Sequence, residues 1–123
     1  METAAVKKYK RQIKAACVEA GTYRPFFDPT ITALAQILEK RDQVQEQYET
    51  EYDSQPVIEY TNKGGSTNPT KNPALVLWSE LTRDALAYRR ELGLTPAGLK
   101  KIDEQSMKPK KKSSLAEVLK DLG

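Results

Sequence analysis

The stretch PALVLWSELTRDALAYRREL, residues 73–92, carries the clearest helical signal in this sequence of 123 residues. Its apolar residues recur every three or four positions, the spacing that gathers side chains on one face of an α-helix. They are Ala74, Leu77, Trp78, Leu81, Ala85, Tyr88 and Leu92. Asn72-Pro73 is a typical helix start, and Gly93 is a typical helix end. The sequence therefore predicts an amphipathic helix with one buried face.

A second long helix is expected over about residues 28–53. Its start is Asp28-Pro29, where the carboxylate would accept free N–H groups and the proline would occupy the first helical position. The stripe of this helix consists of Ile31, Leu34, Leu38, Gln45, Tyr48 and Tyr52. The second half of this helix is poor in aliphatic residues. We therefore expect that half to contact a partner helix or a neighbouring subunit.

Residues 54–71 separate these two helices and lack helical periodicity. The stretch Val57–Thr61 is rich in β-branched and aromatic residues, and Asn62-Lys63-Gly64-Gly65 is typical of a turn. We expect a short β-hairpin or an ordered loop here, at the tip of a long antiparallel helical hairpin.

Two shorter helices complete the predicted mainly α fold. The first covers about residues 3–20 and is closed by Gly21. Its apolar stripe consists of Val6, Tyr9, Ile13, Cys17 and Ala20. The other begins at Thr95-Pro96 and reaches roughly Asp103. Pro25, inside the aromatic turn at residues 23–27, should prevent the first helix from continuing.

The composition changes after Glu104. Residues 105–112 contain four lysines around Pro109 and are predicted to be a flexible basic linker. Residues 113–123 have capping-box spacing at Ser114 and Glu117. The apolar face of this predicted helix consists of Leu115, Val118, Leu119 and Leu122. Because so short a helix is not stable alone in water, we expect it to dock on a partner, in preference to packing on its own domain.

The composition limits the class of protein. Hydrophobic residues make up 38% and charged residues 30% of the chain, which is lean in apolar and rich in charged residues. The single cysteine, Cys17, excludes an intrachain disulfide framework. The longest apolar run, Ala74–Trp78, is far below the roughly 20 residues that a bilayer requires. No apolar signal-peptide core follows Met1, so we expect a reducing cytoplasm and no membrane partner.

Charge is distributed unevenly although the net charge is only +3. Residues 1–24 contain six basic and two acidic residues, residues 25–60 two basic and eight acidic, and residues 61–123 twelve basic and seven acidic. Basic ends around an acidic middle favour phosphate or acidic protein partners at the ends. The alternative is that these runs are only solvated helix faces.

The residues that usually perform catalysis are scarce. The chain has no histidine, the commonest general base and transition-metal ligand. Cys17 lies on an apolar stripe and is expected to be a buried structural thiol, and no glycine-rich phosphate loop is present. Glu39, Asp42, Glu46 and Glu49 share one helix face, but no acid from another element accompanies them, so a Mg²⁺ site is not expected. We predict no enzyme, no metal and no cofactor.

Cations on the first helix are the strongest binding signal. Five of them lie within about two turns, so several can contact phosphates together: Lys7, Lys8, Lys10, Arg11 and Lys14. Such contacts are independent of sequence and sensitive to salt. Lys100 and Lys101 are further candidates, with the basic run at 108–112. Tyr9 and Tyr23 suit packing better than base stacking, and the long second helix fits a helix-turn-helix motif poorly.

Four strings occur in order along residues 5–104. They are GTYRP at 21–25, VIEYTN at 57–62, Asn72-Pro73 before a helix containing Trp78, and YRRELGLTPAGLKKI at 88–102. Together they resemble the P27 family of phage terminase small subunits, most sharply in ELGLTP at 91–96 followed by Gly98. The chain departs from the family at Leu99, where relatives often carry a basic residue, so no nucleic-acid contact is assigned there.

The resemblance implies a non-catalytic DNA-packaging protein of the host cytoplasm. Members of the family are helical, assemble into rings, recognise viral DNA and present it to the large subunit, which holds the ATPase and nuclease. Residues 1–104 would then be the DNA-binding and oligomerisation core, and residues 113–123 would dock on the large subunit. The implied partners are double-stranded viral DNA, the large terminase subunit and further copies of this chain.

Three other hypotheses remain open. A structural adaptor would form oligomers that ignore DNA, with its charge serving only solubility. A small dimeric DNA-binding regulator would bind one short site tightly. A metal-dependent nuclease using the acidic face at residues 39–49 would cut plasmid in the presence of Mg²⁺ or Mn²⁺.

Overall fold

The computed structural model describes residues 2–105, and the predicted C-terminal helix and most of the predicted basic linker lie outside the described residues. The elements are, in chain order, α1 (Ala4–Ala20), the 3₁₀ turn η1 (Pro25–Phe27), α2 (Asp28–Glu51), β1 (Val57–Thr61), β2 (Thr67–Lys71) and α3 (Pro73–Glu91). A further helical segment covers residues 96–105. The fold is mainly helical, as predicted.

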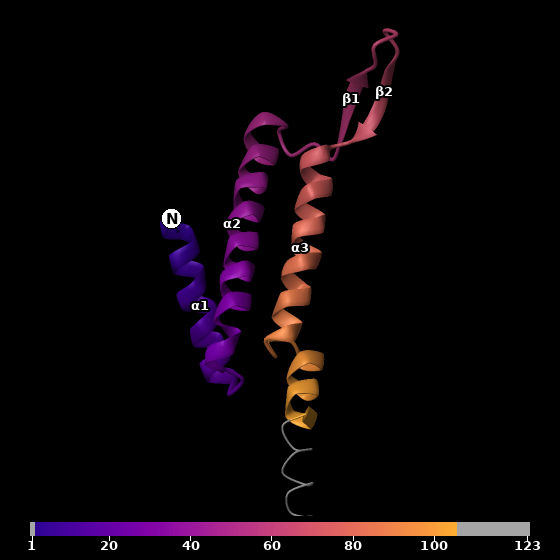
Figure 1. Cartoon of the computed structure of the whole chain (residues 1–123). Helices are drawn as coiled ribbons and strands as arrows, with labels where there is room; N and C mark the ends of the chain where they lie inside the picture. The colour runs from indigo at the N-terminus through magenta and orange to yellow at the C-terminus, as the bar shows by residue number, and fades with distance from the viewer. Residues whose placement is uncertain (1, 106–123) are drawn as a thin grey trace, which may run out of the picture.

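Helix α2 is central, with α3 antiparallel on one side and α1 along its first half on the other (Figure 1). The buried residues that hold the three helices together are Val6, Ile13, Cys17, Ile31, Leu34, Ala35, Leu38, Ala85 and Leu92. The contribution of α2 comes entirely from residues 31–38, and no residue of its second half is buried. The prediction that this half has little use for a single core is confirmed for the described chain.

Two of the predicted helix ends, at Gly21 and Asn72, are confirmed, and Thr3 adds a cap that was not predicted. The N–H of Val6 donates to Thr3 Oγ1 over 3.1 Å at the start of α1, and Gly21 ends α1 with a φ of 74°. The N–H of Ala74 donates to Asn72 Oδ1 over 2.9 Å at the start of α3. Asn72 is fully buried and its amide also donates to the Gln55 carbonyl, so this cap joins the hairpin to α3.

The predicted cap of α2 is wrong in one respect. Asp28 is the first residue of α2 rather than its cap, because η1 runs directly into the helix, and no side chain caps this end. The Asp28 carboxylate instead accepts a hydrogen bond from the Tyr23 hydroxyl over 2.9 Å. The Tyr23 hydroxyl is therefore the partner of this carboxylate, in place of the backbone N–H groups that the sequence predicted.

The predicted apolar stripe of α3 is also too wide. Ala74 and Ala85 are buried, Trp78 and Leu81 are partly buried, and Leu77 is 45% exposed. Leu77 lies at the margin of the stripe, since 100° per residue carries it away from the line through Ala74 and Ala85. The narrower buried face leaves apolar surface on α3 available.

The predicted hairpin is confirmed, and it projects beyond the helices (Figure 1). Its strands pair antiparallel with Ile58 opposite Thr70 and Glu59 opposite Pro69. Hydrogen-bonded and non-bonded pairs alternate in such a ladder. Since Asn62 N–H donates to the Ser66 carbonyl at the turn, Pro69 falls in a non-bonded pair. Its nitrogen therefore faces away from β1, and the outer edge of β2 lacks a donor at that position.

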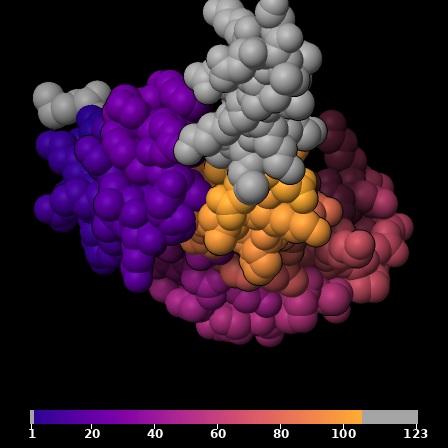
Figure 2. All heavy atoms as spheres, turned by 90° about the horizontal axis from the view of Figure 1, so that it is seen from below, coloured from indigo at the N-terminus to yellow at the C-terminus, as the bar shows by residue number. Residues whose placement is uncertain are grey.

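The lower ends of the helices are locked together by two turns. The hydroxyl of Thr22, after α1, donates to the carbonyl of Leu92, after α3, over 2.8 Å, and both residues are buried. Gly93 follows with a φ of 71°, and a Cβ there would lie 2.7 Å from Thr22 Cγ2 and from Ile102 Cδ1. Figure 2, from below, shows the start of α2 beside residues 96–105. The two turns thus fix residues 96–105 against the rest of the core.

We predict that Gly93→Ala destabilises the fold more than Gly21→Ala. Both glycines have left-handed backbones, so each alanine costs about 1 kcal/mol, but only position 93 is crowded. The overpacking should add about 1–3 kcal/mol at Gly93. Urea unfolding of both variants measures the difference, and equal losses would show that the Thr22–Gly93 contact is not tight.

Candidate nucleic-acid interface

Helix α1 separates its apolar and basic residues by face. Val6, Ile13 and Cys17 are buried against the other helices. Burial raises the pKa of the Cys17 thiol, although a hydrogen bond with Thr22 opposes the shift. A thiol with a raised pKa is a poor nucleophile, in agreement with the structural role predicted from the sequence. The cationic residues occupy the remaining surface of the helix.

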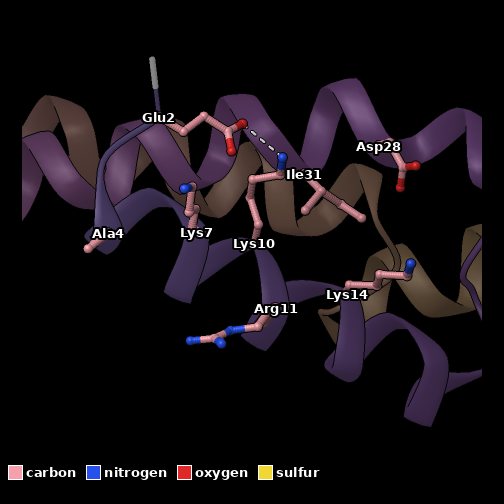
Figure 3. Close-up of a pocket in the computed structure, with 8 residues that line it drawn as sticks. All are labelled: Glu2, Ala4, Lys7, Lys10, Arg11, Lys14, Asp28 and Ile31. Carbon is pink, nitrogen blue, oxygen red and sulfur yellow. Dashed lines mark hydrogen bonds and ion pairs between the residues drawn. The ribbon is translucent and has the colours of Figure 1, made fainter.

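Four of the five predicted cations line one open groove, of about 610 Å³, between α1 and the start of α2. The lining residues are Glu2, Ala4, Lys7, Lys10, Arg11, Lys14, Asp28 and Ile31. Lys7, Arg11 and Lys14 are spaced by four and three residues, which places them on one helix face. Figure 3 shows the four cationic side chains leaving α1, with Ile31 and Asp28 on α2. The groove combines an apolar floor with a cationic wall.

The four cations differ in what holds them. Lys10 Nζ forms an ion pair with Glu2 over 2.8 Å (Figure 3). Lys14 Nζ lies 5.0 Å from the centre of the Tyr23 ring, a cation–π distance. Lys7 and Arg11 form neither an ion pair nor a side-chain hydrogen bond within the described residues. These two are therefore the most available for an anion.

The remaining predicted cations lie elsewhere. Lys8 is exposed but does not line the groove, because one residue turns the helix by 100° from Lys7. Lys100 and Lys101 are exposed on the helical segment at 96–105. That segment is held to the turn after α1 by the Thr22–Leu92 hydrogen bond. The predicted partner-binding residues, Leu115, Val118, Leu119 and Leu122, lie outside the described residues.

Two of the four acids on the predicted acidic face hold α1 in place. The hydroxyl of Thr3 donates to the Glu39 carboxylate, and the hydroxyl of Tyr9 donates to the Asp42 carboxylate. The hydrogen bond to Asp42, with a smaller effect of burial, raises the pKa of Tyr9. Residues 2–105 contain no group of three or more side chains placed to hold a metal ion. This acidic face therefore has a structural use.

The groove also depends on residues that the sequence did not single out. Asp28 and Ile31 belong to α2, and Glu2 precedes α1, so only the tertiary packing brings them beside the cations. Tyr23 was expected to pack rather than to stack on bases. It packs against the core and supports Lys14 from below. The spacing of lysines and apolar residues along α1 predicted the cations of the groove, but no sequence signal predicted its other lining residues.

The fold and the groove describe a small helical protein with a cationic face suited to anionic partners. A model of the family described as "Phage terminase, small subunit" matches residues 5–109, most of the chain. The chain belongs to the phage terminase small subunit family, as its sequence strings predicted, and this places it in phage DNA packaging. Comparisons with curated proteins and with solved structures gave no match. Within residues 2–105, no helix combines the length and apolarity needed to cross a membrane.

We predict that Tyr9→Phe lowers the free energy of unfolding by about 1 kcal/mol at pH 7, the usual net contribution of one hydrogen bond. The pKa of Tyr9 is raised above 10.0 in the folded protein. The stabilisation is therefore complete below pH 10.0 and is lost as the pH rises through the raised pKa. Urea unfolding at pH 7 and above pH 10 measures it.

Tyr60→Phe is the matched control, because Tyr60 is 60% exposed on the hairpin. Its hydroxyl forms no hydrogen bond within the described residues. The control should lose little stability at any pH. Equal behaviour of the two variants would show that the Tyr9–Asp42 hydrogen bond does not hold α1.

Proposed function

We propose that this chain is a small terminase subunit that recognises double-stranded viral DNA through the α1 groove. The observation that carries the proposal is the single groove face shared by Lys7, Arg11 and Lys14, beside Lys10. From Lys7 to Lys14 the helix rises about 10 Å, which allows several backbone phosphates to be contacted at once. Family membership supports a nucleic-acid partner for this face.

Further cations would add phosphate contacts outside the groove. Lys8 on α1 and Lys100 and Lys101 on the segment at 96–105 are exposed. The Thr22–Leu92 hydrogen bond fixes that segment relative to the turn after α1. A duplex held by the groove would therefore meet these lysines in a fixed arrangement. We expect each to contribute less than a groove cation.

In this proposal the chain performs no catalysis and presents DNA to the large terminase subunit in the host cytoplasm. Residues 1–104 serve as the DNA-binding and oligomerisation core, and residues 105–112 as a basic linker. The apolar face of residues 113–123, formed by Leu115, Val118, Leu119 and Leu122, docks on the large subunit. The pattern of a short amphipathic helix after a linker supports this assignment.

We also propose that the chain assembles with itself into a ring. The described core leaves large apolar side chains exposed on α3 and β1, and no residue of the second half of α2 is fully buried. The hairpin contacts the helices little, and an isolated two-stranded hairpin is only marginally stable. Further copies of the chain would cover these surfaces.

Replacing Lys7, Arg11 and Lys14 together by glutamine should lower the affinity for duplex DNA at least about tenfold. The slope of log affinity against log salt concentration should fall by about 3, because each lost phosphate contact removes about 0.9. Fluorescence anisotropy with a labelled duplex over a series of salt concentrations measures both quantities.

The matched control replaces Lys40, Lys63 and Lys71 by glutamine, which changes the net charge equally but leaves the groove intact. All three are exposed on α2 or the hairpin. Its salt slope should equal that of the native chain. If both triple variants lost the same affinity, overall charge rather than the groove would attract DNA, and the site assignment would be wrong.

Native mass spectrometry of the full chain tests the ring. We expect one large multiple of the 13.9 kDa protomer, because a closed ring has a fixed number of copies. The same measurement with duplex DNA shows whether the assembly binds it. A monomer or dimer under all conditions would overturn the ring and favour the small dimeric regulator.

A further inference from the structure

The outer side of α3 carries a second stripe that faces away from the core. Its members are spaced by three, four, three and four residues, the pattern of a helix-packing seam. They are Val76, Ser79, Arg83, Leu86 and Arg90, and all are exposed. Val76 and Leu86 are 40% and 48% exposed. We call this set the arginine stripe, because it combines two aliphatic side chains with two guanidinium groups.

Helix α2 carries a complementary surface where α1 no longer covers it. The N-terminal cap of α1, Thr3, reaches Glu39, and Tyr9 reaches Asp42. The same side of α2 continues beyond them with Glu46 and Glu49, both exposed. We call Asp42, Glu46 and Glu49 the acidic stripe. Neither stripe forms an ion pair within residues 2–105, where the one ion pair joins Lys10 to Glu2.

The two stripes match in spacing as well as in sign. Arg83 and Arg90 are seven residues apart, as are Asp42 and Glu49. At 1.5 Å per residue, both pairs span about 10.5 Å along their helices. Two guanidinium groups can therefore meet two carboxylates in one register. Val76 and Leu86 would gain burial between these charges, which the free protomer does not provide.

The two stripes form no ion pair with each other within residues 2–105 of one copy, so their pairing would join two copies. The acidic stripe follows the side of α2 that packs on α1, whereas the arginine stripe points away from the face of α3 that packs on α2. Different surfaces meeting head to tail generate a ring when the rotation closes. The acidic stripe would repel DNA, so a second copy of the chain fits it better.

The hairpins offer no equivalent route. A head-to-tail ring of paired strands needs both edges of every hairpin. Pro69 removes a donor from the outer edge of β2, which interrupts such a ladder. Helical faces are then left to carry the contact between copies.

We propose that the arginine stripe of one copy packs on the acidic stripe of the next, and that this head-to-tail contact closes the assembly. The inference rests on the proposed ring and names the surfaces that form it.

Charge reversal on the full chain tests the pairing. The variant R83E/R90E and the variant E46R/E49R should each raise the half-assembly concentration at least about tenfold, because like charges placed opposite each other repel strongly. The combined four-residue variant should regain part of the native assembly, since two glutamates on α3 then face two arginines on α2, while Asp42 keeps its charge and its hydrogen bond with Tyr9. Analytical ultracentrifugation measures assembly, and circular dichroism confirms folding.

The matched control is K8E/K40E, which has the same change of charge as R83E/R90E but replaces exposed lysines of α1 and the middle of α2, outside both stripes. It should assemble like the native chain. If the folded double variants also assembled normally, the ring would stand and this interface would be wrong. If they failed and the combined variant failed too, the stripes would not face each other. A native chain that stays monomeric would instead overturn the proposed ring itself.

A DNA-binding role for Arg83 and Arg90 is the competing explanation, and the same variants decide it. Duplex affinity is measured by anisotropy for R83E/R90E at a concentration where the native chain is assembled. Normal assembly with weakened DNA binding would assign the arginine stripe to DNA and overturn the proposal. Loss of assembly with rescue by E46R/E49R would support it, because DNA phosphates cannot be matched by reversing acids on α2.

Discussion

The structure depends on one buried cluster, in which Ile31, Leu34, Ala35 and Leu38 of α2 pack with apolar residues of α1 and α3. A chain with few apolar residues can build one dense core only by concentrating them, and this chain concentrates them at one end of its longest helix. The Thr22–Leu92 hydrogen bond closes that end from below. The remainder of α2 contacts α3 but has no fully buried residue of its own. The buried core therefore lies at one end of the helices, and exposed apolar side chains lie on α3 and β1.

The local features of this fold could be predicted from sequence because they depend on neighbouring residues only. Asn72 caps α3, Gly21 ends α1, and the turn after Thr61 makes a hairpin. The cap at Asp28 failed because η1 runs directly into α2, which makes Asp28 the first helical residue, and its carboxylate accepts from Tyr23 instead. The predicted burial of Leu77 is wrong because a stripe with three- and four-residue spacing is wider than the face that one neighbouring helix covers.

In the candidate site, too, the sequence predicted local features but not the contacts between distant residues. Sequence spacing identified the cations of α1, but only the packing on α2 shows that Lys8 lies apart from the groove and that Ile31 forms its floor. The sequence showed the acidic face as a pattern, and the use considered for it was the metal site of a nuclease, which was not expected. In the structure, Glu39 and Asp42 accept hydrogen bonds from Thr3 and Tyr9, so this face helps to hold α1 on α2. Long-range partners of this kind have no signature in a single sequence.

Pro69 has a consequence for the behaviour of the chain at high concentration. The hairpin is exposed and rich in β-forming residues on β1, features that favour uncontrolled growth of sheets into fibrils. A sheet grows by strand addition when each new strand meets an edge with free N–H donors and C=O acceptors. Because Pro69 removes one donor from the outer β2 edge, strand addition is less favourable there than along β1. One proline therefore makes the continued growth of a sheet from this hairpin less favourable on one of its two edges.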